Sequence, residues 1–379
     1  MNDNFMWKAQ SETIDALRVP MTILVVCIHF NILAYPLVSH GDVIQYDISW
    51  VQYPISLFSE VLGRLAVPFF FLISGYFFFL KDNQFTSAIY LNKLKKRFYS
   101  LFVPYVSWWI VACVLTFVFS KAKLVAHLSF YDYLCGIWCS PKSNLFLTTS
   151  INTPLDGPLW FLRDLMLTMV LSPFIYLLIK NRKHSAVLLL FLSIVYVIFG
   201  GLDLPQYFIP GLSFPCLLFF SIGGYLGFHK INMIELLYPY RTIILPLSFL
   251  LIVLDVCLTG YTAPLTWGSS MFQNGYIHHA QILLGVPATL LVGYSLRNKM
   301  QWFKQHSASS FTIFALHKII ILPVGYIVVY LLHIGNVIST AIALMLYFGI
   351  ILLLTIVGIF AHWVISKNTF LRKAFTGDR

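Results

Sequence analysis

Long apolar runs separated by short polar segments recur along the whole chain and predict membrane-spanning helices. Each run approaches or exceeds the roughly 17 residues that a helix needs to cross a bilayer. The ten predicted spans are residues 16–35, 55–80, 101–120, 158–179, 186–202, 208–228, 242–259, 277–296, 311–332 and 337–365. This pattern predicts an all-α, polytopic membrane protein in which residues 1–379 form a single membrane domain.

Cationic residues are distributed unevenly between the two sides of these spans. Nineteen Lys and Arg residues lie on the side of the amino terminus, whereas three lie on the opposite side. Because short cytoplasmic loops carry the excess of positive charge, both termini are predicted to be cytoplasmic. The formal net charge of +11 therefore reflects membrane topology and does not indicate nucleic-acid binding. The six cysteines lack the paired spacing of metal ligands, so no metal site is predicted.

The first apolar segment carries two ionisable residues on one predicted helix face. His29 follows Arg18 by eleven positions. At about 100° per residue this separation is about 20° more than three full turns, and the rise is about 16 Å. His29 is thus expected near the middle of a hydrocarbon core about 30 Å thick. An ionisable residue at that depth indicates a functional site, while a neutral His bonded to a neighbouring helix is the structural alternative.

Further polar residues fall inside the second and ninth spans. Arg64 is expected near mid-depth, where it needs a carboxylate, a carbonyl or a bound anion. An ion pair with Glu60, four residues earlier, is the structural alternative. Pro68 and Ser74-Gly75 predict a bent helix that packs closely against another helix. His317 lies about two turns into the ninth span and is a second inward polar residue.

The loop between the second and third spans is the most basic stretch of the chain. Its clustered cations are Lys93, Lys95, Lys96 and Arg97. Orientation of the protein or contact with anionic lipid explains such a cluster. A docking site for a phosphate-bearing cytoplasmic donor is the functional alternative.

Aromatic and charged residues open the fourth span on the opposite side. Trp160 and Phe161 fit the aromatic belt at a membrane interface. Arg163 and Asp164 follow less than two turns inside the span, where their charged ends can reach back to the interface. A polar lining of an outer vestibule is the functional alternative. In the sixth span, Gly223-Gly224 and Gly227 predict close helix packing.

Taken in this order, four segments resemble the membrane-bound acyltransferase 3 family, in particular its small O-acetyltransferases. They are Ile14–Arg18 with His29, Gly63–Tyr76, Leu159–Leu162 and Ser310–His317. The family usually has Gly after the motif Arg, whereas Val19-Pro20 follows here. Because Pro is tolerated in the first helical turn, the helix is expected to begin near Arg18.

The resemblance implies a membrane O-acyltransferase of the bacterial inner (cytoplasmic) membrane. It would move an acyl group, with acetyl implied by the family, from cytoplasmic acetyl-CoA or another acyl-CoA to a hydroxyl of an extracytoplasmic or lipid-linked glycan. The acyl-CoA is then a cosubstrate, and no tightly bound cofactor is expected. The implied partners are the acyl-CoA, the glycan acceptor and membrane lipids, with no nucleic acid.

This reaction suggests a role for each candidate residue. His29 is expected to act as general base or as nucleophile, and Arg64 to stabilise an oxyanion. The residues expected on the donor side are Arg18, Lys93, Lys95, Lys96, Arg97 and His317, and those on the acceptor side are Trp160, Arg163 and Asp164.

The rival class is a transporter or lipid translocator with a polar intramembrane cavity, since such proteins also bury ionisable residues. The chain shows no detectable internal repeat, which favours the enzyme.

Overall fold

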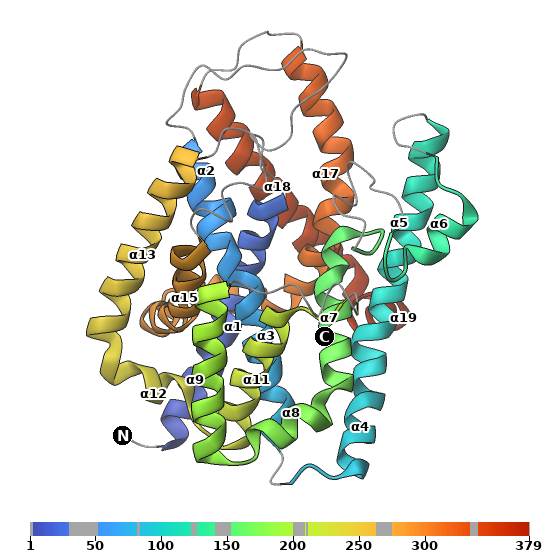
Figure 1. Cartoon of the computed structure of the whole chain (residues 1–379). Helices are drawn as coiled ribbons and strands as arrows, with labels where there is room; N and C mark the ends of the chain where they lie inside the picture. The colour runs from blue at the N-terminus through green and yellow to red at the C-terminus, as the bar shows by residue number, and fades with distance from the viewer. Residues whose placement is uncertain are drawn as a thin grey trace.

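The structure is a computed structural model that describes residues 3–29, 52–81, 84–122, 127–140, 153–199, 209, 211–262, 275–333 and 340–378. Every regular element within these ranges is a helix. Most of the long helices lie roughly lengthwise, side by side in one bundle (Figure 1). The predicted all-α class is confirmed for the described residues.

The elements follow one another in three groups. The first contains α1 (Asp3–His29), α2 (Gln52–Ser56), η2 (Leu57–Leu62), η3 (Gly63–Leu65), α3 (Ala66–Phe79), α4 (Ser87–Arg97), η4 (Phe98–Phe102), α5 (Val103–Lys121) and α6 (Phe130–Cys135). The second contains η5 (Gly157–Leu159), α7 (Trp160–Val170), α8 (Ser172–Ile179), α9 (Arg182–Phe199), α11 (Phe214–Phe228), α12 (Met233–Leu237), η6 (Tyr238–Tyr240), α13 (Arg241–Thr262) and α15 (Gly275–Leu296). The last contains α16 (Gln301–Gln305), η7 (Ser307–Ser309), α17 (Ser310–His333), α18 (Thr340–Ser366) and α19 (Thr369–Thr376).

All ten predicted spans coincide with helices where the structure describes them. Six of the described helical segments are long and apolar enough to cross a membrane. The number becomes seven if α7 and α8, which are bent by 65° at their junction, form one span. The chain is therefore a multi-pass membrane protein, and the ten crossings and the cytoplasmic termini stay predictions.

The amino end of the first helix differs from the prediction. α1 begins at Asp3 and continues through Pro20, so the expected start near Arg18 is wrong. Gln10 explains the longer helix, because it joins α1 to two other elements. Its Nε2 donates to the Tyr76 hydroxyl at 2.8 Å, and its Oε1 accepts from the Met233 backbone N–H at 2.6 Å. These two hydrogen bonds stabilise the amino-terminal half of α1 and offset the loss of the one helical hydrogen bond that Pro20 cannot donate.

Glycines allow α3 and α11 to approach closely at the centre of the bundle. A Cβ atom added to Gly223 would lie 1.9 Å from the Leu72 carbonyl oxygen, and one added to Gly75 would lie 2.0 Å from that of Phe220. No side chain fits at these positions without separating the two helices. The predicted close packing of Ser74-Gly75 and of the sixth span is confirmed.

Gly223→Ala is expected to destabilise the protein, because its methyl group would push α11 away from the backbone of α3. The control is Gly349→Ala in α18, where an added Cβ meets no atom within 4 Å. There Ala should leave stability unchanged or raise it by up to about 1 kcal/mol through its higher helix propensity. The measurement is the thermal midpoint in detergent, and equal midpoints for the two variants would contradict the close contact.

Candidate active site

A cavity of about 520 Å³ lies among α1, α3, η4, α7 and the start of α17. Ligand pockets in proteins are typically of this size, about 300–1,000 Å³. Arg18 and Arg97 contribute cationic groups to its wall, and Phe70, Phe161 and Phe311 contribute aromatic rings. No acidic residue lines it in the described part of the chain. The cavity therefore suits a ligand with an anionic portion and an apolar portion.

The predicted basic cluster divides between two faces of α4. Arg97 lines the cavity, and Lys93 lies four residues earlier on the same face. Lys93 donates to the Phe78 carbonyl and lies over the Phe78 ring, 4.6 Å from its centroid. Lys95 and Lys96 are exposed and do not line the cavity. The structure thus brings only Arg97 from this cluster together with Arg18.

Arg18 forms an ion pair with the residue three positions before it. Its Nη1 lies 3.3 Å from Asp15 Oδ1, and both side chains are more than one-third exposed. Such an exposed pair is weak, at roughly 0–1 kcal/mol. The guanidinium therefore retains donors for another anion.

The imidazoles of His29 and His317 lie side by side, with ring centroids 5.1 Å apart. Nδ1 of His317 is 2.5 Å from the Phe314 carbonyl oxygen. Because a carbonyl only accepts, Nδ1 carries the proton, and Nε2 of the neutral ring has a free lone pair. That Nε2 atom is buried and has no hydrogen-bond partner among the residues that the structure describes. His317 is therefore placed beside His29 and does not line the cavity.

The imidazole pair is connected to the cavity wall through two ring contacts. The Phe161 ring, which lines the cavity, is 5.6 Å from the Phe314 ring. The Phe314 ring is in turn 6.1 Å from the His317 ring. The aromatic rings of Phe161 and Phe314 thus link the cavity wall to the imidazole pair.

Arg64 lies in an irregular stretch of the second predicted span. The segment passes through a π-helical turn, η2, and a 3₁₀ turn, η3, before α3 begins. Local π-helical turns are frequent at functional sites. Nη2 of Arg64 is 2.7 Å from Glu60 Oε2, which confirms the predicted i, i+4 pair, and about a quarter of each side chain is exposed. The Arg64 charge also interacts electrostatically with His29.

Hydrogen bonds fix the irregular segment to α1 beside His29. The Ser59 hydroxyl donates to the Cys27 carbonyl at 2.8 Å, and it also bonds the Tyr347 hydroxyl of α18 at 2.7 Å. Three helices are therefore joined within two residues of His29. The position of Arg64 relative to His29 follows from this junction.

Asp156 and Lys318 are two buried charged residues to which the sequence pattern assigned no role. Asp156 is 0% exposed and Lys318 is 1% exposed, and their charges attract each other. Neither carboxylate oxygen of Asp156 has a hydrogen-bond partner in the described ranges. Burial raises the pKa of Asp156 to about 8, and the attraction to Lys318 limits the rise. The signal available in the sequence was Lys318 itself, a cation inside an apolar span directly after His317.

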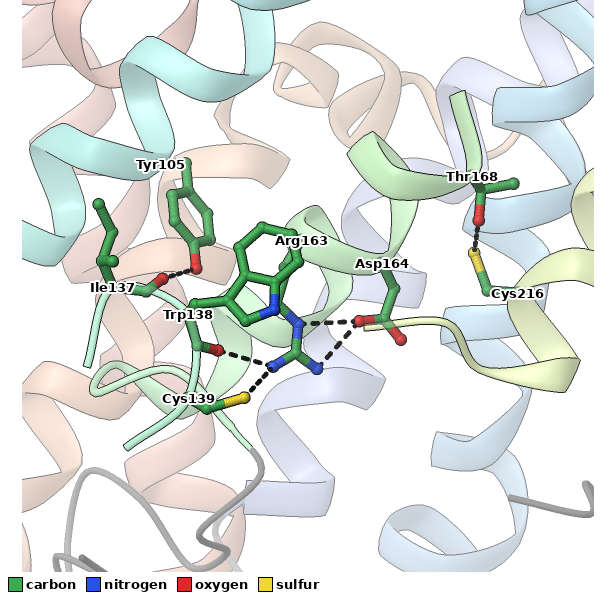
Figure 2. Close-up of polar contacts among 8 residues, drawn as sticks. All are labelled: Tyr105, Ile137, Trp138, Cys139, Arg163, Asp164, Thr168 and Cys216. Carbon is green, nitrogen blue, oxygen red and sulfur yellow. Dashed lines mark hydrogen bonds and ion pairs between the residues drawn. The ribbon is translucent and has the colours of Figure 1, made fainter. Parts of the chain in front are cut away.

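Arg163 connects the start of α7 to the segment around Trp138, and Asp164 pairs with Arg163 (Figure 2). Nη1 of Arg163 donates to the Trp138 carbonyl at 2.7 Å, and its Nε and Nη2 donate to Asp164 Oδ1 at 3.2 and 3.1 Å. Both charged side chains are completely buried. The expected role of this pair on the acceptor side stays a prediction. Its contacts show a structural role, which is to connect α7 to the segment around Trp138.

Trp160 and Phe161 pack inside the bundle against α3. Their ring centroids are 6.4 and 4.7 Å from that of Phe71. Trp160 is partly exposed and does not line the cavity, so its expected place on the acceptor side stays a prediction.

Asp156→Asn is expected to stabilise the protein increasingly as pH rises. An Asp in the unfolded chain ionises near pH 3.9, whereas folded Asp156 keeps its proton up to about pH 8. Its contribution to stability is therefore present below pH 4 and is lost progressively as pH rises towards 8. Thermal midpoints of both proteins between pH 5 and 9 measure this, and a pH-independent difference between them would contradict it.

A family model described as "Acyltransferase domain" matches residues 12–364, which include all of the candidate residues above. The succinoglycan biosynthesis protein ExoH of Rhizobium meliloti (strain 1021) is 28% identical over 176 residues. The match covers 46% of this chain and only 44% of that protein. No solved structure gives a significant match.

Proposed function

The chain belongs to the acyltransferase family whose domain covers residues 12–364, and from that premise we propose that it is a membrane O-acyltransferase. The donor is a cytoplasmic acyl-CoA, with acetyl-CoA as the first candidate. The acceptor is a hydroxyl of an extracytoplasmic or lipid-linked glycan. The observation that carries the proposal is the cavity with two arginines, whose wall is connected through Phe161 and Phe314 to the paired imidazoles of His29 and His317.

The chemistry of the cavity supports a coenzyme A donor. Coenzyme A joins a polyanionic nucleotide to a thin pantetheine arm that ends in the thioester. The guanidinium groups of Arg18 and Arg97 can each bind phosphate through two parallel hydrogen bonds. The apolar and aromatic remainder of the lining suits the arm, whose end would lie against Phe161, next to the Phe314 ring.

The imidazole pair supplies the proton transfers that acyl transfer to a hydroxyl requires. One neutral imidazole takes the hydroxyl proton while the oxygen attacks the thioester carbonyl carbon. The carbon–sulfur bond then breaks, the new ester carries the acyl group, and the leaving thiolate receives the proton. His29 is our first candidate for this base, with His317 beside it to stabilise the imidazolium ion. Arg64, whose charge acts on His29, is the candidate for stabilising the oxyanion.

His29 as a nucleophile is the second form of the same mechanism. In that form its nitrogen displaces coenzyme A, carries the acyl group and passes it to the hydroxyl. Incubation with radiolabelled acetyl-CoA without acceptor separates the two forms. Label bound covalently to the protein supports the nucleophile, and its absence supports the base.

The relative and the family support the acceptor class. The name of the relative associates it with the biosynthesis of succinoglycan, a polysaccharide. Family membership and several apolar helices favour a membrane acyltransferase over a transporter. The bacterial inner membrane is the location that we propose on this basis.

Arg97→Gln and Arg18→Lys are each expected to raise the KM for acyl-CoA, because each removes a forked, charge-assisted contact with phosphate. Loss of such a contact corresponds to roughly 10- to 100-fold in affinity. Lys95→Gln on the exposed face of α4 is the matched control and should change the KM by less than about twofold. The measurement is the rate of coenzyme A release against donor concentration. A control variant as impaired as Arg97→Gln would contradict the assignment of the cavity to the donor.

His29→Ala is expected to lower kcat by roughly 10²- to 10⁴-fold, the usual contribution of a general base. His317→Ala should cause a smaller loss if it acts only through His29. His184→Ala, at the exposed start of α9, is the control and should retain full activity. Activity is followed by radiolabel transfer to the acceptor, and the thermal midpoint shows whether each variant is folded. A folded His29→Ala variant with substantial transfer activity would rule out this role.

A further inference from the structure

The helix that carries Arg97 into the cavity wall is not fixed by a buried face of its own. None of the residues of α4, all of which the structure describes, is buried. Since helices in proteins are stabilised mainly by packing of an apolar face, α4 has little of this stabilisation. Arg97 is its last residue, and the π-helical turn η4 follows directly and contains the buried Leu101. The position of Arg97 therefore depends on η4.

The η4 turn is supported from outside the cavity by the end of α19. In the bundle α19 lies against α5 and η4 (Figure 1). A Cβ atom added to Gly377, which follows α19, would lie 2.5 Å from the Ser100 carbonyl oxygen. Ser100 lies between Arg97 and Leu101, and both of these residues line the cavity. The backbone at the end of α19 thus packs directly against the part of η4 that shapes the cavity wall.

A second contact fixes α19 to the helix that continues from η4. Nε1 of Trp108, in α5, donates to the Phe375 carbonyl oxygen at 3.0 Å. The two rings also meet edge to face, with their centroids 5.2 Å apart and an angle of 74° between their planes. Trp108 is buried, so its indole N–H depends on this carbonyl for a partner. The two contacts hold η4 and α5 against α19 at separate points.

The sequence of α19 specifies both ends of this short helix. Oδ1 of Asn368 accepts hydrogen bonds from the backbone N–H groups of Phe370 and Leu371 at 2.9 and 3.1 Å. At the other end Gly377 takes the left-handed conformation, with φ of +66°, and its N–H donates to the Arg372 carbonyl. A helix of eight residues is marginal on its own. The caps and the contacts with α5 and η4 therefore stabilise it together.

We propose that α19 holds the η4 turn in place and thereby sets the position of Arg97 in the donor cavity, with Gly377 and Trp108 as positioning residues. The inference rests on the proposed acyl transfer and adds the element that controls its donor contact. If α19 served only the stability of the bundle, loosening it would affect donor and acceptor alike. If it acts through Arg97, loosening it affects the donor alone.

The test uses the full-length protein in detergent and measures coenzyme A release. The substrates are acetyl-CoA and the alkali-deacylated surface polysaccharide of the cell that carries the gene. Gly377→Ala places a methyl group against the Ser100 carbonyl and a side chain in a left-handed conformation, so the end of α19 must move away from η4. The KM for acetyl-CoA should rise by about 5- to 20-fold, part of the loss expected on removing the Arg97 contact entirely. The kcat and the KM for the polysaccharide should change by less than about twofold.

Trp108→Phe is the second variant, since it keeps an aromatic ring and removes the N–H donor. It should raise the same KM by about 2- to 5-fold. Its effect decides the question if the thermal midpoint shows that Gly377→Ala does not fold. Gly349→Ala, in open space, and Trp363→Phe, at an exposed position of α18, are the matched controls and should change neither KM.

The double variant Arg97→Gln with Gly377→Ala tests whether α19 acts through Arg97. If it does, the KM for acetyl-CoA equals that of Arg97→Gln alone, because the contact that α19 positions is already lost. Multiplied effects would overturn the proposal, as would equal rises of the two KM values in Gly377→Ala. If the wild type releases no coenzyme A, the proposed function fails and the role of α19 fails with it. If the wild type is active and the folded single variants match it, only the role of α19 fails.

Discussion

The cost of removing charged groups from water governs how this bundle is built. A charged side chain inside an apolar helix bundle requires a partner, because the free energy lost on leaving water is several kcal/mol or more. The Arg163–Asp164 pair satisfies most of this requirement through its ion pair and the Arg163 hydrogen bond to the Trp138 carbonyl (Figure 2), and Asp164 Oδ2 alone of its two oxygens lacks a hydrogen-bond partner in the described ranges. Asp156 satisfies it only in part, since its oxygens lack hydrogen bonds in the described ranges and its pKa rises accordingly. The incompletely satisfied group lies in the region of the imidazole pair, where chemistry is proposed.

The position of α3 connects the packing of the bundle to the candidate site. Its glycine contact with α11 fixes it at the centre, and its outer face lines the cavity with Phe70 and Ser74. The irregular turns that precede it carry Arg64 towards His29. One continuous segment thus contributes to the packing core, the cavity and the reacting region. A displacement of α3 would alter all three together.

The arrangement suits a reaction between substrates from two different compartments. The arginine-lined cavity is connected to the imidazole pair through the rings of Phe161 and Phe314. In the proposed reaction neither substrate has to cross the membrane. The acyl group alone changes sides, and His29 acts on it during the transfer.

Properties that depend on neighbouring residues in the sequence could be predicted correctly. Helical periodicity and hydrophobicity identified the helices, the Glu60–Arg64 pair and the glycine faces, because all of these follow from the geometry of one helix. The resemblance of four segments to the acyltransferase 3 family predicted the family correctly. The extension of α1 through Pro20 could not be predicted in the same way, since Gln10 is held by residues more than sixty positions away.

Only the tertiary structure decided which polar groups meet. The sequence placed His317 on the donor side, but the packing of α17 against α1 brings it to His29. The packing of the whole bundle selects Arg97 from four clustered cations, buries Asp156 near Lys318 and brings Tyr196 of α9 beside His279 of α15. The physical reason is that periodicity fixes the direction of a side chain around its own helix axis. The neighbour it faces depends on how separate helices pack, which is determined by the shapes and polar contacts of the whole bundle.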